Sequence, residues 1–130
     1  MRHALASGLV RVVTLALLGA AVLFAAWANS AGGGDRVDQA LDLEADIEHG
    51  QQLYSQLTNP TCASCHSLRD AGATSNIASD LDDFRPSARV TIQSLIGGTT
   101  PEHDREGYSD ELSNKDLADL ARYIESVAGN

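Results

Sequence analysis

Two cysteines and a histidine stand at a spacing with a defined chemistry. Residues 62–66 read Cys-Ala-Ser-Cys-His, and Cys62 and Cys65 are the only two cysteines of the chain. A C-x-x-C-H run is the signature of covalent c-type haem attachment. The two thiols add across the vinyl groups of the haem, and the histidine that follows can reach the iron from one face. The motif therefore predicts one haem c, bound through Cys62 and Cys65, with His66 as the proximal iron ligand.

Paired cysteines also occur in two other kinds of site. A thioredoxin-like dithiol lies next to a βαβ pattern, and the hydrophobic spacing of this sequence predicts no such unit. A structural zinc site has four protein ligands, commonly two cysteine pairs, whereas Cys62 and Cys65 are a single pair. The pattern therefore favours haem attachment over a redox dithiol or a zinc site.

The opposite face of the iron has no methionine available. Met1 is the only methionine in the sequence, so a thioether ligand on the opposite face of the iron cannot be supplied by the folded part of the chain. His103, in a polar loop before the last predicted helix, is the leading candidate for the sixth ligand. The alternative is an open or water-filled site. His49, Lys115 and Tyr108 are minor candidates.

The first 28 residues have the composition of an export segment. Arg2 and Arg11 precede an uncharged run over 12–28 that is rich in Ala, Leu and Val. A positive stretch followed by an apolar one is typical of a signal peptide, and Ala26-Trp27-Ala28 offers small residues to a signal peptidase. The length of the run is also near the lower limit for a membrane span. We expect residues 1–28 to be a signal peptide or an uncleaved membrane anchor, with the remainder in the periplasm.

The chain is strongly acidic. Nine Lys and Arg face 18 Asp and Glu, and without residues 1–28 the basic residues fall to seven, for a formal charge of −11. Such a surface repels nucleic acid and anionic lipid headgroups and is steered towards a basic patch on a partner. General solubility of an exported protein would explain the same charge. We expect no nucleic-acid binding, and a redox partner with a basic docking patch.

Hydrophobic spacing predicts helices in the rest of the chain and no strand. Apolar residues recur at spacings of three and four, the pattern of amphipathic helices, in three segments: 42–57, 86–96 and 114–127. Ser113 or Asn114 would cap the last helix.

Two stretches lack this pattern. Residues 29–41 are rich in Gly, Asp and Gln, and we interpret them as a flexible linker. Residues 67–83 form a polar loop with few large hydrophobic side chains. In so small a domain these side chains need a partner to pack against, and a haem would provide one. We expect Leu81 and Phe84 to contact the haem.

Together, these features resemble the class I cytochrome c domain, the small monohaem electron-transfer family. In that family a glycine and an aromatic residue four positions later on the first helix pack against an aromatic residue on the last helix. Gly50, Tyr54 and Tyr123 match these positions. The resemblance covers residues 42–128 and implies an all-α fold, with three or four helices around one covalently bound haem, for a domain of residues 42–130.

Two segments depart from the family pattern. The family's Gly-Pro-x-Leu segment, whose backbone carbonyl accepts a hydrogen bond from the proximal histidine, is replaced by Ala78-Ser79-Asp80-Leu81. Because any residue has a carbonyl, Ser79 can still accept this bond. The family's distal Gly-x-Met-Pro segment is replaced by Gly98-Thr99-Thr100-Pro101. A hydroxyl at Thr100 is a poor ligand for low-spin iron, so His103 is the leading candidate and an open site is the alternative.

The resemblance implies an electron carrier that is not an enzyme by itself. It would pass electrons between redox partners or serve as the haem subunit of a larger oxidoreductase. The stretch 65–74 is similar to monohaem cytochromes that accompany periplasmic dehydrogenases, such as the sulfite-oxidising type. An open distal site would instead suit a protein that binds or senses diatomic gases. Two imidazole ligands would give a lower potential than His/Met ligation, because methionine raises the potential.

Overall fold

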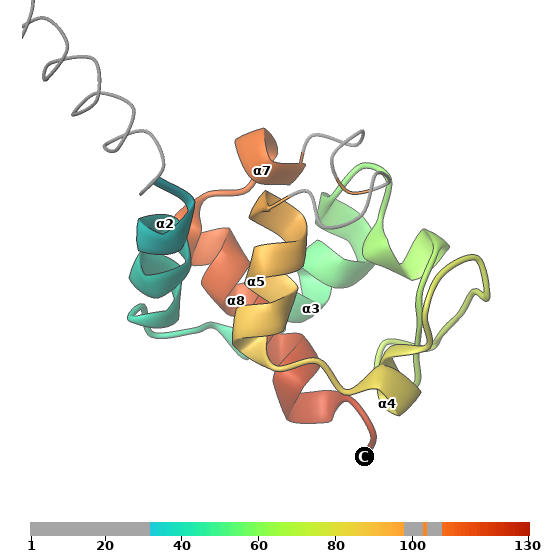
Figure 1. Ribbon diagram of the computed structural model, residues 1–130. Helices are drawn as coiled ribbons and strands as arrows, with labels where there is room; N and C mark the ends of the chain where they lie inside the picture. The colour runs from blue at the N-terminus through green and yellow to red at the C-terminus, as the bar shows by residue number, and fades with distance from the viewer. Residues whose placement is uncertain (1–31, 98–102, 104–107) are drawn as a thin grey trace, which may run out of the picture. The chain divides into compact units, whose positions relative to one another are not determined.

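The computed structural model describes residues 32–97, 103 and 108–130. The expected export segment 1–28 and Thr100 lie outside these residues. No helix within the described part of the chain has the length and apolar character needed to cross a membrane. Residues 33–130 form one compact unit built mainly of short helices (Figure 1).

In chain order, the elements are α2 (Gly32–Leu41), α3 (Ile47–Gln52), the π-helical turn η1 (Leu53–Leu57), the 3-10 turn η2 (Cys62–Ser64), strands β1 (Ser67–Leu68) and β2 (Ala73–Thr74), α4 (Leu81–Phe84), α5 (Ala88–Ile96), α7 (Tyr108–Glu111) and α8 (Asn114–Val127). Helices α3 and α5 both pack on α8, which forms the centre of the unit in Figure 1. The fold is helical, as expected.

The last helix begins and ends where its sequence pattern predicts. Ser113 is the N-cap, its hydroxyl accepting from the backbone N–H of Asp116, and the Asp116 side chain accepts in return from the Ser113 N–H. This capping box satisfies two amide groups that would otherwise lack partners at the helix start. The buried face of α8 includes Leu117, Leu120 and Ile124.

The first predicted helix is shorter than its hydrophobic pattern indicates. It begins at Ile47 and not at residue 42, because Asp46 adopts an extended conformation and caps α3 by accepting from the His49 N–H. Leu43 and Ile47 are 41% and 43% exposed. Their spacing therefore does not mark a buried face, and the packed part of this segment starts at Gly50.

The expectation of a flexible linker at 29–41 is wrong for residues 32–41. Residues 32–41 form α2, whose Val37 and Ala40 are buried in the core. The Arg36 guanidinium donates to the side-chain oxygen of Asn114 at 3.0 Å and also to the Leu112 carbonyl. Helix α2 is thus held by contacts with residues 76 and 78 positions later in the sequence, which its own composition does not indicate.

The segment expected as loop 67–83 contains regular structure. Strands β1 and β2 pair antiparallel, with Ser67 opposite Thr74, which corrects the expectation of no strand. Helix α4 follows, capped by the Asp80 carboxylate, which accepts from two backbone N–H groups. The next helix, α5, starts at Ala88 with Ser87 as its cap, two residues later than the predicted segment 86–96.

Candidate haem-binding site

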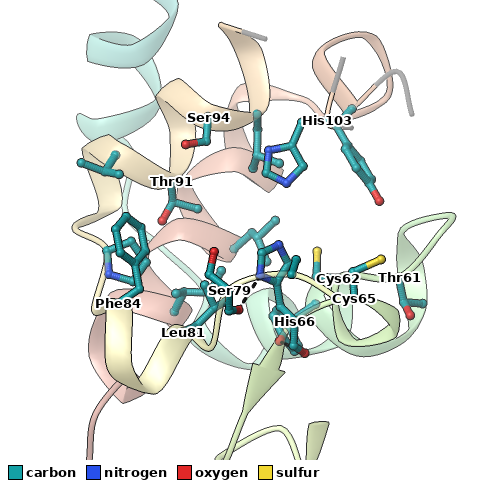
Figure 2. Close-up of a pocket in the computed structure, with 18 of the residues that line it drawn as sticks. Thr61, Cys62, Cys65, His66, Ser79, Leu81, Phe84, Thr91, Ser94 and His103 are labelled. Atoms are coloured by element: carbon teal, nitrogen blue, oxygen red, sulfur yellow. Dashed lines mark hydrogen bonds between the residues drawn. The ribbon is translucent and has the colours of Figure 1, made fainter. Parts of the chain in front are cut away.

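A cavity of about 630 Å³ opens between the C-x-x-C-H turn and α4, α5 and α8. This volume lies in the usual range of about 300–1,000 Å³ for pockets that bind small molecules and cofactors. The predicted haem-attachment, haem-contact and leading ligand residues all line this cavity; they are Cys62, Cys65, His66, Leu81, Phe84 and His103. Further apolar walls come from Val90, Leu95, Leu120 and Ile124. Figure 2 shows the two sulfur atoms on one side of the pocket and Phe84 on the other.

The two cysteines are brought together by the 3-10 turn η2. The backbone N–H groups of Cys65 and His66 both donate to the Cys62 carbonyl, at 3.1 and 2.9 Å. This tight turn holds all three side chains of the motif at the cavity. Burial raises the pKa of the Cys62 thiol to about 11, although a hydrogen bond with Thr58 acts in the opposite direction. In the absence of haem, Cys62 is therefore a neutral thiol at pH 7.

Two hydrogen bonds hold His66, one at its ring and one at its backbone carbonyl. Its Nδ1 lies 2.8 Å from the Ser79 carbonyl oxygen, so the ring donates Nδ1–H and leaves Nε2 free to bind a metal. The expected bond to Ser79 is therefore present. The Tyr54 hydroxyl donates to the His66 carbonyl at 2.9 Å. Burial raises the pKa of Tyr54 well above its usual value, which keeps this hydroxyl protonated as a donor.

His103 faces His66 across the cavity. Their ring centroids are 6.1 Å apart and their ring planes differ by 40°, and Figure 2 shows a ring nitrogen of each directed into the space between them. If each imidazole nitrogen lies about 2.0–2.1 Å from one metal ion, and about 1.15 Å from its own ring centre, two rings on opposite sides have centres about 6.3–6.5 Å apart. The observed separation of 6.1 Å is slightly shorter than this and close to what one iron between the two histidines requires.

The minor candidates for the sixth ligand have other partners. His49 Nδ1 lies 3.0 Å from the buried Asp119 carboxylate, and Lys115 donates to the other oxygen of Asp119. Neither residue lines the cavity. Tyr108 does line it, but its hydroxyl donates to the Pro60 carbonyl at 2.6 Å. Among the described residues, His103 is therefore the side chain placed to bind iron opposite His66.

Sequence reasoning missed several polar residues of the pocket. Thr91 and Ser94 project from α5 into the cavity, and Thr61 lies beside the cysteines (Figure 2). The spacing of Thr91 and Ser94, three residues apart on one helix, puts them on one face. This spacing could have indicated that Thr91 and Ser94 share a surface. The apolar pattern of α5, however, does not show that this polar face borders a cavity.

The cavity fits a haem by the chemistry of its lining. Two thiols stand at one edge, two imidazoles face each other from opposite sides, and the walls are largely apolar. A helical fold that holds a C-x-x-C-H turn against such a cavity defines a class I c-type cytochrome.

The comparisons with known proteins agree with this class. The chain belongs to the cytochrome c family, whose model, "Cytochrome c", matches residues 47–128. The sequence is similar to cytochrome c-551 of Halorhodospira halochloris, with 36% identity over 66 residues, which is 48% of this chain and 84% of that protein. The fold is similar to the crystal structure of the c-type cytochrome SorU from Sinorhizobium meliloti, with a TM-score of 0.58 and 26% identity over 65% of this chain and 92% of SorU.

Membership of the family assigns the cofactor. One haem c is bound covalently through Cys62 and Cys65, as the motif predicts. The family also indicates haem-based electron transfer as the general activity.

Proposed function

We propose that this protein is a periplasmic electron carrier whose haem iron is bound by His66 on one face and His103 on the other. The bound haem supplies one-electron redox chemistry. The observation that carries the proposal is the facing pair of imidazoles, 6.1 Å apart across the cavity. If His66 and His103 both held the iron, the bound haem would suit electron transfer better than the binding of an external ligand.

The protein would hold the iron in a narrow range of geometry during electron transfer. Ser79 and Tyr54 fix the His66 ring and its backbone through hydrogen bonds of 2.8 and 2.9 Å. The apolar walls from α4, α5 and α8 would limit contact between the haem and water. Two imidazole ligands favour a lower potential than His/Met ligation, so we expect a low-potential carrier.

We expect the partner to dock at the exposed edge of the cavity. Ile77 and Phe84 line the cavity and are 77% and 60% exposed, and the exposed Asp80 and Asp83 lie close to them in sequence. The formal charge of −11 without residues 1–28 favours a partner with a basic docking patch. That partner is a soluble redox protein or the catalytic subunit of an oxidoreductase.

Location outside the cytoplasm rests on residues 1–28. Their charge and hydropathy pattern supports export, followed by cleavage after Ala28 or retention as an anchor. The mass of the protein purified from the periplasm and from the membrane fraction distinguishes the two. A full-length protein found in the cytoplasm with no haem attached would contradict export.

Visible spectra of the purified protein with and without carbon monoxide test the proposed ligation. The proposal expects low-spin spectra in both oxidation states and no change of the ferrous spectrum with carbon monoxide. His103→Ala should become high-spin and bind carbon monoxide, whereas His49→Ala, a histidine outside the cavity, should keep the parent spectrum. A parent protein that is high-spin and binds carbon monoxide would instead support a gas-binding function, and an unchanged spectrum in His103→Ala would exclude His103 as the ligand.

A further inference from the structure

Tyr108 joins the two sides of the cavity. It is the first residue of α7 and is 5% exposed. Its hydroxyl donates to the carbonyl of Pro60 at 2.6 Å, two residues before Cys62. A side chain from the distal part of the chain is therefore hydrogen-bonded to the segment that carries the haem-attachment turn.

The Tyr108 ring also packs against the proposed sixth ligand. Its centroid lies 6.1 Å from that of His103, with an angle of 76° between the two planes. This edge-to-face arrangement is one of the preferred geometries for aromatic pairs. The ring thus limits the orientations open to the His103 imidazole on the side of Tyr108.

Helix α7 is itself held against the rest of the domain. The Leu112 N–H donates to the Tyr108 carbonyl at 3.1 Å, and the Leu112 carbonyl accepts from Arg36 of α2. Leu112 is buried, and α7 packs on α5. The Tyr108 backbone is therefore a fixed support, and its side chain can hold His103 relative to that support.

We propose that Tyr108 is the positioning residue for His103, keeping the imidazole over the iron by its ring contact and by its bond to Pro60. This inference rests on the proposed ligation by His103. When the hydrogen bond from Tyr108 to Pro60 is lost, His103 should be dissociated from the iron in a larger fraction of the molecules. An external ligand binds only that open form, so its observed binding rate rises in proportion to the open fraction.

The test compares the rate at which cyanide binds to the ferric protein at pH 7 in the parent and in Tyr108→Phe. This variant keeps the ring and loses the hydroxyl. A net hydrogen bond in a protein corresponds to a change in population of roughly three- to tenfold, so we expect Tyr108→Phe to bind cyanide about that much faster while staying low-spin in the absence of cyanide. Tyr108→Leu, which also loses the ring contact, should bind cyanide faster still.

Tyr123→Phe is the matched control. In the parent protein the Tyr123 hydroxyl donates to the Asp70 carboxylate at 2.7 Å, and Tyr123 does not line the cavity. It should lose stability in urea as Tyr108→Phe does, yet bind cyanide at the parent rate. Parent-like cyanide binding in Tyr108→Phe, or an equal acceleration in Tyr123→Phe, would overturn the proposal.

The proposed ligation has its own test. If His103→Ala keeps the parent low-spin spectrum, the ligation fails, and the role of Tyr108 fails with it. If His103→Ala becomes high-spin while Tyr108→Phe binds cyanide as the parent does, the ligation stands and only the role of Tyr108 is wrong.

Discussion

Gly50 on α3 lies directly against Tyr123 on α8. A Cβ atom at position 50 would be 2.7 Å from the Cβ of Tyr123 and closer still to the backbone carbonyl of Asp119. One turn later the Tyr54 ring contacts the Tyr123 ring, with centroids 6.1 Å apart. Because the Tyr54 hydroxyl also bonds the His66 carbonyl, the close crossing of the two helices reaches the proximal side of the haem site.

Gly50→Ala tests this close approach. The added methyl group meets backbone atoms of α8 that cannot rotate away, so the helices must separate. We expect a loss of at least about 2 kcal/mol in the free energy of unfolding in urea, within the range for overpacking a core. Gln52→Ala, on an exposed position of the same helix, should change it by less than about 0.5 kcal/mol. A Gly50→Ala protein as stable as the parent would show that the contact is not close.

Asp119 makes stability depend on pH. It is 1% exposed and accepts hydrogen bonds from Lys115, His49 and the Asp46 N–H. Burial acts to raise the pKa of this carboxyl, but the hydrogen bonds outweigh it and hold the pKa below its usual value. A lowered pKa means that the charged carboxylate stabilises the fold above about pH 4, and that this contribution is lost as the pH falls through the lower folded-state value.

The variant Asp119→Asn removes this dependence. The difference in unfolding free energy between the parent and Asp119→Asn should be largest near pH 7 and shrink as the pH is lowered from 4 towards 2. Asp42→Asn, on an exposed aspartate, serves as the control and should follow the parent at each pH. A difference between the parent and Asp119→Asn that stays constant from pH 7 to pH 2 would contradict the assignment.

The features predicted correctly from sequence depend on residues close together in the chain. The C-x-x-C-H turn is closed by bonds within residues 62–66, and the Ser113–Asp116 capping box spans four residues. Helix α2 was missed because its stability comes from the burial of Val37 and Ala40 by distant parts of the chain. Gly and Asp have a weak helix preference, and the local composition of residues 29–41 therefore favoured a linker.

On the side of the cavity that holds His103, contacts between distant residues were likewise not predictable from the sequence. The position of His103 before the last helix was enough to nominate it, because the resemblance supplied the place where a ligand is expected. Tyr108 appeared only as a weak ligand candidate. Its hydroxyl partner is the Pro60 carbonyl, 48 residues earlier, and a backbone acceptor at that distance leaves no mark in the sequence.

Removal of the haem should unfold much of the domain. The cavity of about 630 Å³ is lined by side chains from α4, α5 and α8, and without the haem their apolar surface is exposed to water, which removes a major source of stabilisation. The variant Cys62→Ser with Cys65→Ser cannot attach haem covalently. We expect it to keep less than about half of the parent helical signal in far-ultraviolet circular dichroism. Retention of the full signal and a cooperative thermal transition would show that the core is sufficient without the cofactor.

The Tyr54 hydroxyl is expected to stabilise the fold without determining the ligation of the iron. Tyr54→Phe keeps the ring contact with Tyr123 and loses the bond to the His66 carbonyl, which should cost about 0.5–1.5 kcal/mol in urea unfolding. Its visible spectrum should match the parent, because Ser79 still orients the His66 ring. Tyr54→Leu also removes the aromatic pair and should cost more. If the two variants lose equal stability, the hydroxyl accounts for the whole effect, and a high-spin spectrum in Tyr54→Phe would show that the bond is needed to hold His66 on the iron.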